Sequence, residues 1–283
     1  MKKILVPVDF SDTSLNALEI AGQLAVRANT GIYLLHVNET APYLMSVQRY
    51  DIPAAEFAAD AYSKEATERM RLLRVDLEND SQFSKLPIQS NVKEGMMIPI
   101  LQELVKTEGI DLIVMGTLGA SGWDEVLVGS NTERVIRHAP CPVLVIPGGI
   151  NQLNIRRIVV PSTLKADQKS VFQTVKIWQD LLSFKIEVLY INDPIHVLAS
   201  DGVKAGMDQL IQKIGLKDIH LHSRGWTQNE EEAILTYAET VKADLIVMGT
   251  HQRRGLSHLL FGSIVEDTVN HTHMPVLSVP IGS

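Results

Sequence analysis

The chain has 283 residues, enough for two ordinary domains, and a formal net charge of −7 at pH 7. An acidic chain does not favour binding to nucleic acid or to an anionic membrane surface, so we expect neither as a partner. Aromatic residues make up only 5% of the chain while aliphatic residues are plentiful, a composition typical of parallel strands buried between helices.

The start of the chain and its cysteine content indicate a cytoplasmic protein. Met1 to Asp9 is basic and then apolar, but Asp9 interrupts the apolar run and no small-residue cleavage site follows, which predicts a strand rather than a signal peptide. No segment approaches the roughly 20 apolar residues that a membrane helix needs. Cys141 is the only cysteine, so no internal disulfide can form, and we interpret it as a core residue beside a strand.

Apolar runs alternate with amphipathic stretches along the first half of the chain. We expect strands at 4–8, 32–37, 87–93, 111–115 and 143–146, and helices at 11–28, about 54–78, 98–107 and 131–138. Ser11 and Asp12 are candidates for capping the first helix. This alternation predicts parallel strands joined by right-handed crossovers, and ligands of such sheets lie at the carboxyl ends of the strands.

A glycine-rich loop connects the fourth expected strand to the last expected helix. Its glycines are Gly116, Gly119 and Gly129. Gly116 and Gly119 lack side chains that would hold a ligand away from the main chain, and Gly129 frees the turn before the helix. We expect Ser130 to cap that helix, with Glu133 completing a capping box. The N–H groups and the positive dipole at such a helix start attract an anion such as phosphate.

The spacing of these glycines separates two interpretations. In one, they only make a tight connection between strand and helix. In the other, which we favour, they bind a ligand, because two residues separate Gly116 from Gly119 and nine residues separate Gly119 from Gly129-Ser130. The loop is neither a P-loop, since no Gly-Lys-Ser/Thr follows, nor a G-x-G-x-x-G dinucleotide fingerprint.

The chain also repeats itself. Asp111 to Thr117, D-L-I-V-M-G-T, recurs letter for letter at Asp244 to Thr250, 133 residues later, whereas Ile4 to Pro7 recurs at Ile158 to Pro161 with an offset of 154. The second copy has therefore lost 21 residues, opposite about 38–92 of the first. We predict two domains, the first copy at 1–147 and the second copy at 154–283.

V-P-V-D-F-S at Val6 to Ser11, L-L-H-V at Leu34 to Val37, and the glycine spacing resemble the universal stress protein family of the ATP-binding kind. The resemblance covers essentially the whole chain as a tandem pair. It implies an α/β fold of two tandem five-stranded parallel-sheet sandwiches with helices on both faces, like the adenine nucleotide alpha-hydrolases.

The resemblance also implies an adenine nucleotide site in the first copy. The adenosine end would be bound by Pro7, Val8, Asp9 and Val37, the ribose and phosphates by Met115, Gly116 and Gly119, and the phosphate tail by Gly129, Ser130, Asn131 and Thr132. Asp9 could also cap a helix, which does not exclude a ligand contact, and we expect His36 to be an interior histidine rather than a catalyst. The ligand would be ATP, ADP or AMP. The loop has no Lys or Arg but contains Asp124 and Glu125, so a triphosphate needs Mg²⁺ carried in with it.

The second copy departs from this pattern. Gln252 stands at the position of Gly119, and Thr163 stands at the position of Asp9. We therefore expect this copy to bind nucleotide weakly or not at all. The alternative is that Arg253, Arg254 and His251 hold an anion in another way.

The last strand of each copy is short and apolar and lies at an expected sheet edge, where its main-chain N–H and C=O groups are left unpaired and can hydrogen-bond to another strand. In relatives these strands pair with each other, which implies an intramolecular pseudo-dimer of the two copies. Two chains could further assemble as a homodimer.

Three functions fit the sequence. The leading one is a stress-response sensor or regulator that binds adenine nucleotide with little turnover. The second is an interaction scaffold whose glycine loop is only structural. The third is an ATP-using enzyme, for which Ser121 and Asp124 are the only candidates in the loop and neither has an evident partner. We assign no catalytic residue and no dedicated metal site, and expect at most slow hydrolysis.

Overall fold

The computed structural model describes residues 1–39, 52–117, 129–162, 168–191, 200–224, 229–251 and 262–281. The chain forms two compact units. Unit 1 comprises Met1–Gly116, Ala139–Cys141 and Ile150–Leu153, and unit 2 comprises Thr117–His138, Pro142–Gly149 and Asn154–Ser283. The described residues form eight helices and ten strands, so the predicted α/β fold is confirmed.

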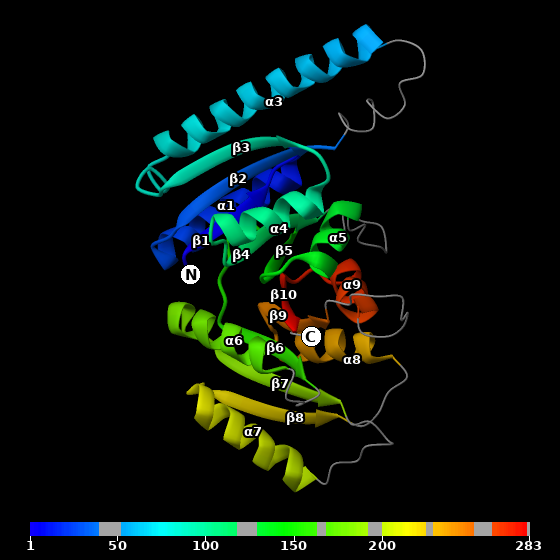
Figure 1. Ribbon diagram of the computed structural model, residues 1–283. Coiled ribbons are helices and arrows are strands. Elements are labelled where there is room, and N and C mark those ends of the chain that lie inside the picture. The colour runs from blue at the N-terminus through cyan, green and yellow to red at the C-terminus, as the bar shows by residue number, and fades with distance from the viewer. Residues whose placement is uncertain are drawn as a thin grey trace. The chain divides into compact units, whose positions relative to one another are not determined.

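Unit 1 is a four-stranded parallel sheet with three helices (Figure 1). Its elements are β1 (Lys3–Pro7), α1 (Asp12–Ala28), β2 (Gly31–Asn38), α3 (Ile52–Asn79), β3 (Ile88–Glu94), α4 (Met97–Thr107) and β4 (Leu112–Thr117). The strand order is β3-β2-β1-β4, and the unit boundary falls within β4. β1 therefore lies between β2 and β4.

Local sequence explains why α1 begins and ends where it does. Ser11 precedes the helix in an extended conformation, and its hydroxyl accepts a hydrogen bond from the Ser14 N–H at 3.3 Å, so the predicted capping by Ser11 is confirmed. Asn29 ends the helix with φ 48, the left-handed conformation that asparagine tolerates. Between these caps, α1 packs its apolar face on β1 and β2.

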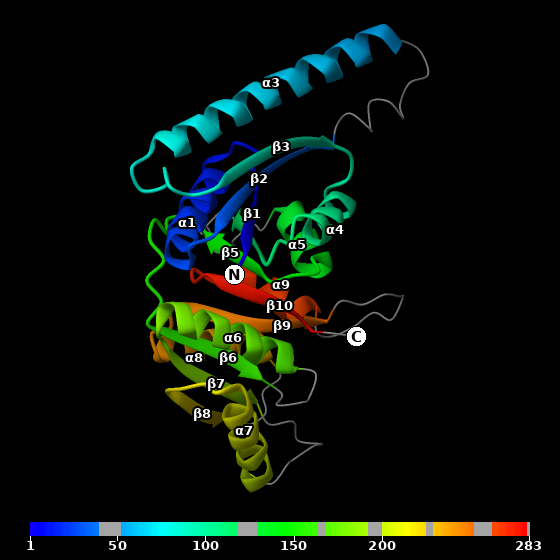
Figure 2. The ribbon, with the colours of Figure 1, turned by 60° about the vertical axis from the view of Figure 1, so that its left-hand side comes forward.

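Unit 2 is a six-stranded sheet with five helices, and Figure 2 shows α6 lying across one face of it. Its elements are α5 (Ser130–His138), β5 (Val143–Pro147), β6 (Arg157–Ser162), α6 (Lys169–Leu182), β7 (Lys185–Ile191), α7 (Ser200–Ile214), β8 (Ile219–Arg224), α8 (Glu230–Thr240), β9 (Leu245–His251), α9 (Gly262–His271) and β10 (Val276–Ile281). The strand order is β5-β10-β9-β6-β7-β8.

The last strands of the two copies pair with each other, as predicted. β10 and β5 are antiparallel, with Leu277 opposite Leu144, whereas β10 is parallel to β9. Each copy thus contributes five strands, but β5 and α5 of the first copy cluster with the second. This pairing removes two edges that would otherwise present unpaired main-chain groups to solvent.

The residues missing from the second copy lie where the two offsets predicted them, between the second and third strands of each copy. The helix in this connection is α3 in the first copy, with 28 residues, and α7 in the second, with 15. α3 packs along β3 and β2 of its own unit (Figure 1). The loss has therefore shortened a helix beside the sheet and left the strands in place.

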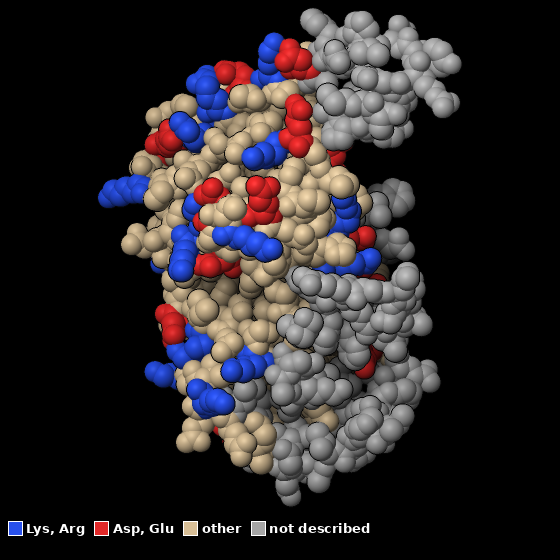
Figure 3. All heavy atoms as spheres, in the orientation of Figure 1, with Lys and Arg blue, Asp and Glu red and all other residues tan. Residues whose placement is uncertain are grey.

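The described surface mixes both signs of charge. Figure 3 shows Lys and Arg interspersed with Asp and Glu over the coloured part of one face. Among the described residues, none of the helices is both long enough and apolar enough to cross a bilayer.

Candidate functional site

The carboxyl ends of β2, β1 and β4 lie side by side in unit 1. Six of the predicted site residues lie at these ends, namely Pro7, Val8, Asp9, Val37, Met115 and Gly116. Four more lie at the start of α5 in unit 2, namely Gly129, Ser130, Asn131 and Thr132. Gly119 lies outside the described residues. The two groups belong to different units, so their meeting in one site stays a prediction.

Strand register places Pro7, Val37 and Met115 on the same face of the sheet of unit 1. Pro7 is opposite Leu35 in β2, and Leu5 is opposite Ile113 in β4. Because side chains two residues apart share a face, these three residues share one. Pro7 and Met115 are buried and Val37 is half-buried, which makes a mostly apolar surface at the ends of the strands.

Gly116 points to the opposite face, where α1 begins. A Cβ at Gly116 would lie 2.2 Å from the carbonyl oxygen of Thr13, a distance too short for two atoms that are not bonded. The missing side chain therefore lets the first turn of α1 approach β4. The sequence offered two interpretations of Gly116, a tight connection and a ligand contact. The close approach of α1 supports a structural role, and the ligand contact stays a prediction.

Asp9 sits in the turn between β1 and α1, with its side chain exposed to solvent. Its carboxylate accepts hydrogen bonds from the Ser11 N–H at 3.0 Å and from the Ser11 hydroxyl at 2.5 Å. Partial desolvation would raise the pKa of Asp9, but these hydrogen bonds, with a contribution from Ser14, lower it below its ordinary value of 3.8. The contact with the N-cap residue thus fits the capping interpretation, and a ligand contact of Asp9 stays a prediction.

His36 in β2 is an interior residue with one bonded nitrogen. Its side chain is 5% exposed, and Nδ1 lies 2.7 Å from the carbonyl oxygen of Val8, so Nδ1 is the donor. Nε2 is buried, and no partner for it lies among the described residues. The centroid of the Phe10 ring lies 4.9 Å from that of the imidazole. The Arg69 guanidinium lies over the Phe10 ring, with its central carbon 4.2 Å from the ring centroid, a cation–π pair that the sequence did not reveal.

The start of α5 differs from the predicted capping box. The helix begins at Ser130, and the Gly129 carbonyl accepts hydrogen bonds from the N–H groups of Thr132 and Glu133 at 2.9 and 3.3 Å. Gly129 therefore precedes the helix and Ser130 is its first residue, so the prediction that Ser130 caps it was wrong by one position. Asn131 is exposed, and its side-chain oxygen accepts from Arg134 at 3.1 Å.

Unit 2 contains a pocket at the carboxyl ends of its strands, and its empty space, counted together with the open solvent at its mouth, is about 570 Å³. It is lined by Pro161, Ser162, Gln168, Leu189, Glu230, Ile234, Met248, Gly249, Ile264 and Val265. Six of these positions correspond, through the internal repeat, to Pro7, Val8, Met115, Gly116, Asn131 and Thr132 of the first copy. The pocket thus occupies the repeat-equivalent place in the second copy.

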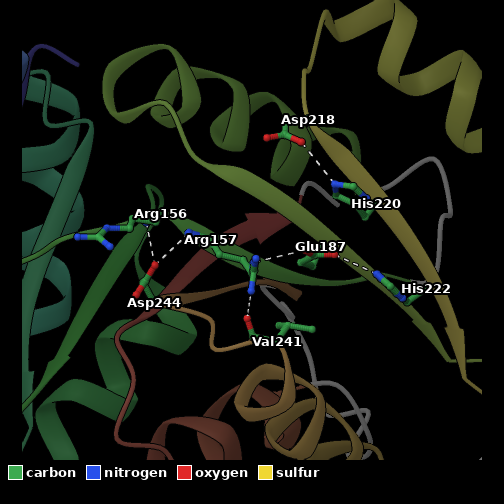
Figure 4. Close-up of polar contacts among 8 residues, drawn as sticks. All are labelled: Arg156, Arg157, Glu187, Asp218, His220, His222, Val241 and Asp244. Atoms are coloured by element: carbon green, nitrogen blue, oxygen red, sulfur yellow. Dashed lines mark hydrogen bonds and ion pairs between the residues drawn. The ribbon is translucent and has the colours of Figure 1, made fainter.

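A charged cluster that sequence reasoning missed crosses three strands of unit 2 (Figure 4). Glu187 in β7 is 7% exposed and lies between Arg157 of β6 and His222 of β8, at 3.4 and 3.0 Å. The Arg157 guanidinium also donates to the Val241 carbonyl. Burial, reinforced by the nearby Glu187, raises the pKa of Tyr237 to about 12. The only sequence signal for this cluster was a glutamate inside an otherwise apolar strand.

Comparison with known proteins identifies the family. The sequence profile of the universal stress protein family matches residues 1–147 and 154–280. Universal stress protein Slr1230 of Synechocystis is 24% identical, over 98% of this chain and 99% of its own. Universal stress protein MJ0531 of Methanocaldococcus jannaschii is 32% identical, over 51% of this chain and 81% of its own.

A solved structure has the same fold along the whole chain. The crystal structure of a universal stress protein from Archaeoglobus fulgidus matches with a TM-score of 0.76 and 19% identity, and covers 99% of this chain and 98% of that one. The chain belongs to the universal stress protein family, as a tandem protein with two family domains.

Replacing Asp9 should make stability depend less on pH. Since the folded pKa is lowered, the carboxylate contributes stability above pH 3.8 and loses it as the pH falls through the folded pKa. Asp9→Asn should therefore lower Tm at pH 7, and the difference from the parent protein should vanish toward pH 2. Asp76→Asn, at an exposed position of α3, is the control. A difference in Tm that is constant with pH would contradict this.

A side chain at Gly116 should push α1 away from β4. We expect Gly116→Ala to lower the free energy of unfolding by about 1–3 kcal/mol, since Thr13 meets the new methyl group with main-chain atoms that cannot rotate away. Urea unfolding measures the change. Gly206→Ala in α7, where a Cβ meets nothing within 4 Å, should leave the protein as stable or more stable.

Removing the charge of Glu187 should destabilise unit 2. Glu187→Gln keeps the shape but leaves Arg157 and His222 without their carboxylate, and we expect a loss of about 1–3 kcal/mol in urea unfolding. Glu239→Gln, at an exposed position of α8, is the matched control. Equal stability of the two variants would show that the cluster contributes nothing.

Proposed function

We propose that the first copy binds an adenine nucleotide, ATP, ADP or AMP, and that the protein senses or regulates a stress response through this ligand. One observation carries the proposal. The glycine sequence with the family's spacing begins at Gly116 in β4, and the ends of β1, β2 and β4 present Pro7, Val37 and Met115 on one face of the sheet.

The chemistry of the residues fits the two ends of such a ligand. The surface of Pro7, Val37 and Met115 is mostly apolar and suits an adenine ring, which a protein binds through contact area and a few polar groups. At the start of α5, the N–H groups of Ser130 and Asn131 have no acceptor within the helix, because the first intrahelical bonds come from Thr132 and Glu133. Such N–H groups, with the helix dipole, suit a phosphate.

Mg²⁺ would accompany a triphosphate. The loop contributes Asp124 and Glu125 but no Lys or Arg, so the protein itself does not neutralise the phosphates there. A divalent cation bound mainly by phosphate and water oxygens, as Mg²⁺ prefers, supplies the missing positive charge.

Two other functions remain as alternatives. The structural requirement for Gly116 is compatible with a scaffold without nucleotide, because the approach of α1 to β4 needs this glycine whether or not a ligand binds. Slow ATP hydrolysis would need Ser121 or Asp124, both outside the described residues. Asp124→Ala with unchanged turnover would remove Asp124 from consideration.

The proposal extends to the organisation of the protein. We infer domains at 1–147 and 154–283, a second copy that binds nucleotide weakly or not at all, a cytoplasmic location, and two chains assembled as a homodimer. The net charge of −7 supports a protein that does not depend on nucleic acid or membrane surfaces.

A side chain at Gly119 should weaken nucleotide binding. MgATP at about 100 times its dissociation constant adds roughly 2.7 kcal/mol of stability and should raise Tm by several degrees. We expect Gly119→Gln to lower affinity for MgATP at least about tenfold, measured by calorimetry, because the side chain would stand where the phosphates approach the main chain.

The matched control is Gly206→Gln, which adds the same side chain to an exposed position of α7 with nothing within 4 Å. It should leave affinity unchanged. No thermal shift with MgATP, MgADP or AMP would favour the scaffold, and equal affinity of Gly119→Gln and the parent protein would reject the role of the loop. Mass spectrometry of molecules released from the denatured protein would identify which nucleotide is carried.

A further inference from the structure

The pocket of unit 2 keeps the apolar face of the first copy. Pro161 of β6 is opposite Leu189 of β7, and Val159 is opposite Ile246 of β9. Side-chain alternation therefore places Pro161, Leu189 and Met248 on one face, and all three line the pocket. Pro161 and Met248 correspond to Pro7 and Met115, and Leu189 corresponds to Leu35.

The helix start beside this pocket has changed from polar to apolar. Gly129-Ser130 recurs as Gly262-Ser263, so Asn131 and Thr132 of α5 correspond to Ile264 and Val265 of α9. Both apolar residues line the pocket, and Val265 is 1% exposed. A branched hydrocarbon side chain offers no hydrogen bond to a phosphate oxygen, and a phosphate bound against it would lose hydration without replacement.

Among the lining residues that the structure describes, the polar groups do not restore an anion site. The Ser162 hydroxyl donates to the side-chain oxygen of Gln168, so two of the polar side chains bind each other at the pocket wall. The third is Glu230, the first residue of α8, whose exposed carboxylate lies at the pocket and repels a second negative charge.

We propose that this pocket binds an uncharged, phosphate-free ligand, with adenosine or a related purine nucleoside as the class that fits best. The pocket lies at the carboxyl ends of the strands, where ligands of such sheets bind, and it is open to solvent. The apolar face holds the ring, and the apolar residues of α9 and the carboxylate of Glu230 exclude nucleotides. This assignment rests on the proposed function for the identity of the adenosine end.

The test uses the full-length protein saturated with MgATP, so that the first copy is occupied. Calorimetric titration with adenosine should reveal one site per chain, and AMP should bind at least about tenfold more weakly. Ile264→Asp should lower affinity for adenosine at least about tenfold, because it places a hydrated carboxylate in the apolar lining. The fold should tolerate this change, since Ile264 is half-buried in the first turn of α9, where a negative charge is favourable.

Two further variants complete the design. Ile177→Asp makes the same change at a position of α6 that is 53% exposed and outside the pocket, and should leave both affinities unchanged. Glu230→Gln should bring the affinity for AMP closer to the affinity for adenosine, because it removes the carboxylate that repels the phosphate.

Absence of adenosine binding at millimolar concentration, AMP binding as tight as adenosine, or adenosine binding that Ile264→Asp leaves intact would each overturn the proposal. If MgATP itself fails to bind, the proposed function fails, but the effect of Ile264→Asp on adenosine still decides the role of this pocket.

Discussion

Parallel pairing in register is the constraint on which the candidate sites depend. With β1 between β2 and β4, three strand ends far apart in the sequence lie together, and side-chain alternation decides which residues can share a ligand. Pro7, Val37 and Met115 fall on one face by this rule alone. Gly116 falls on the other, where its missing side chain admits the first turn of α1.

The same register holds in the second copy, where different side chains occupy the equivalent positions. β6, β7 and β9 repeat the register, so Pro161, Leu189 and Met248 again share a face. β4 and β9 share the sequence L-I-V-M-G-T, whose first four residues are buried in both copies. The helix starts differ, since Ile264 and Val265 of α9 stand where α5 has Asn131 and Thr132. One backbone can therefore present two sites of different chemistry.

Much of the fold could be predicted from the sequence because it follows from local patterns. Apolar periodicity predicted the strands of the first copy within about two residues, and Ser11 was a correct capping candidate because its hydroxyl acts within one turn. Ser130 was placed one position off, since a Gly-Ser pair allows either residue to precede the helix and only the hydrogen bonds of Gly129 decide. The cluster around Glu187 needed three strands in register, which no local pattern contains.

The internal repeat predicted how many strands each copy contributes but not how the elements would cluster. β5 and α5 belong to the first copy in sequence but cluster with unit 2, through the predicted pairing of β5 with β10 and through Arg137 of α5, which donates to Glu266 of α9 at 2.9 Å. A short apolar edge strand gains more by pairing than by remaining exposed, and its helix follows because the connection between them is short. Mutations in α5 should consequently affect the stability of unit 2, although the sequence assigns this helix to the glycine-rich loop of the first copy.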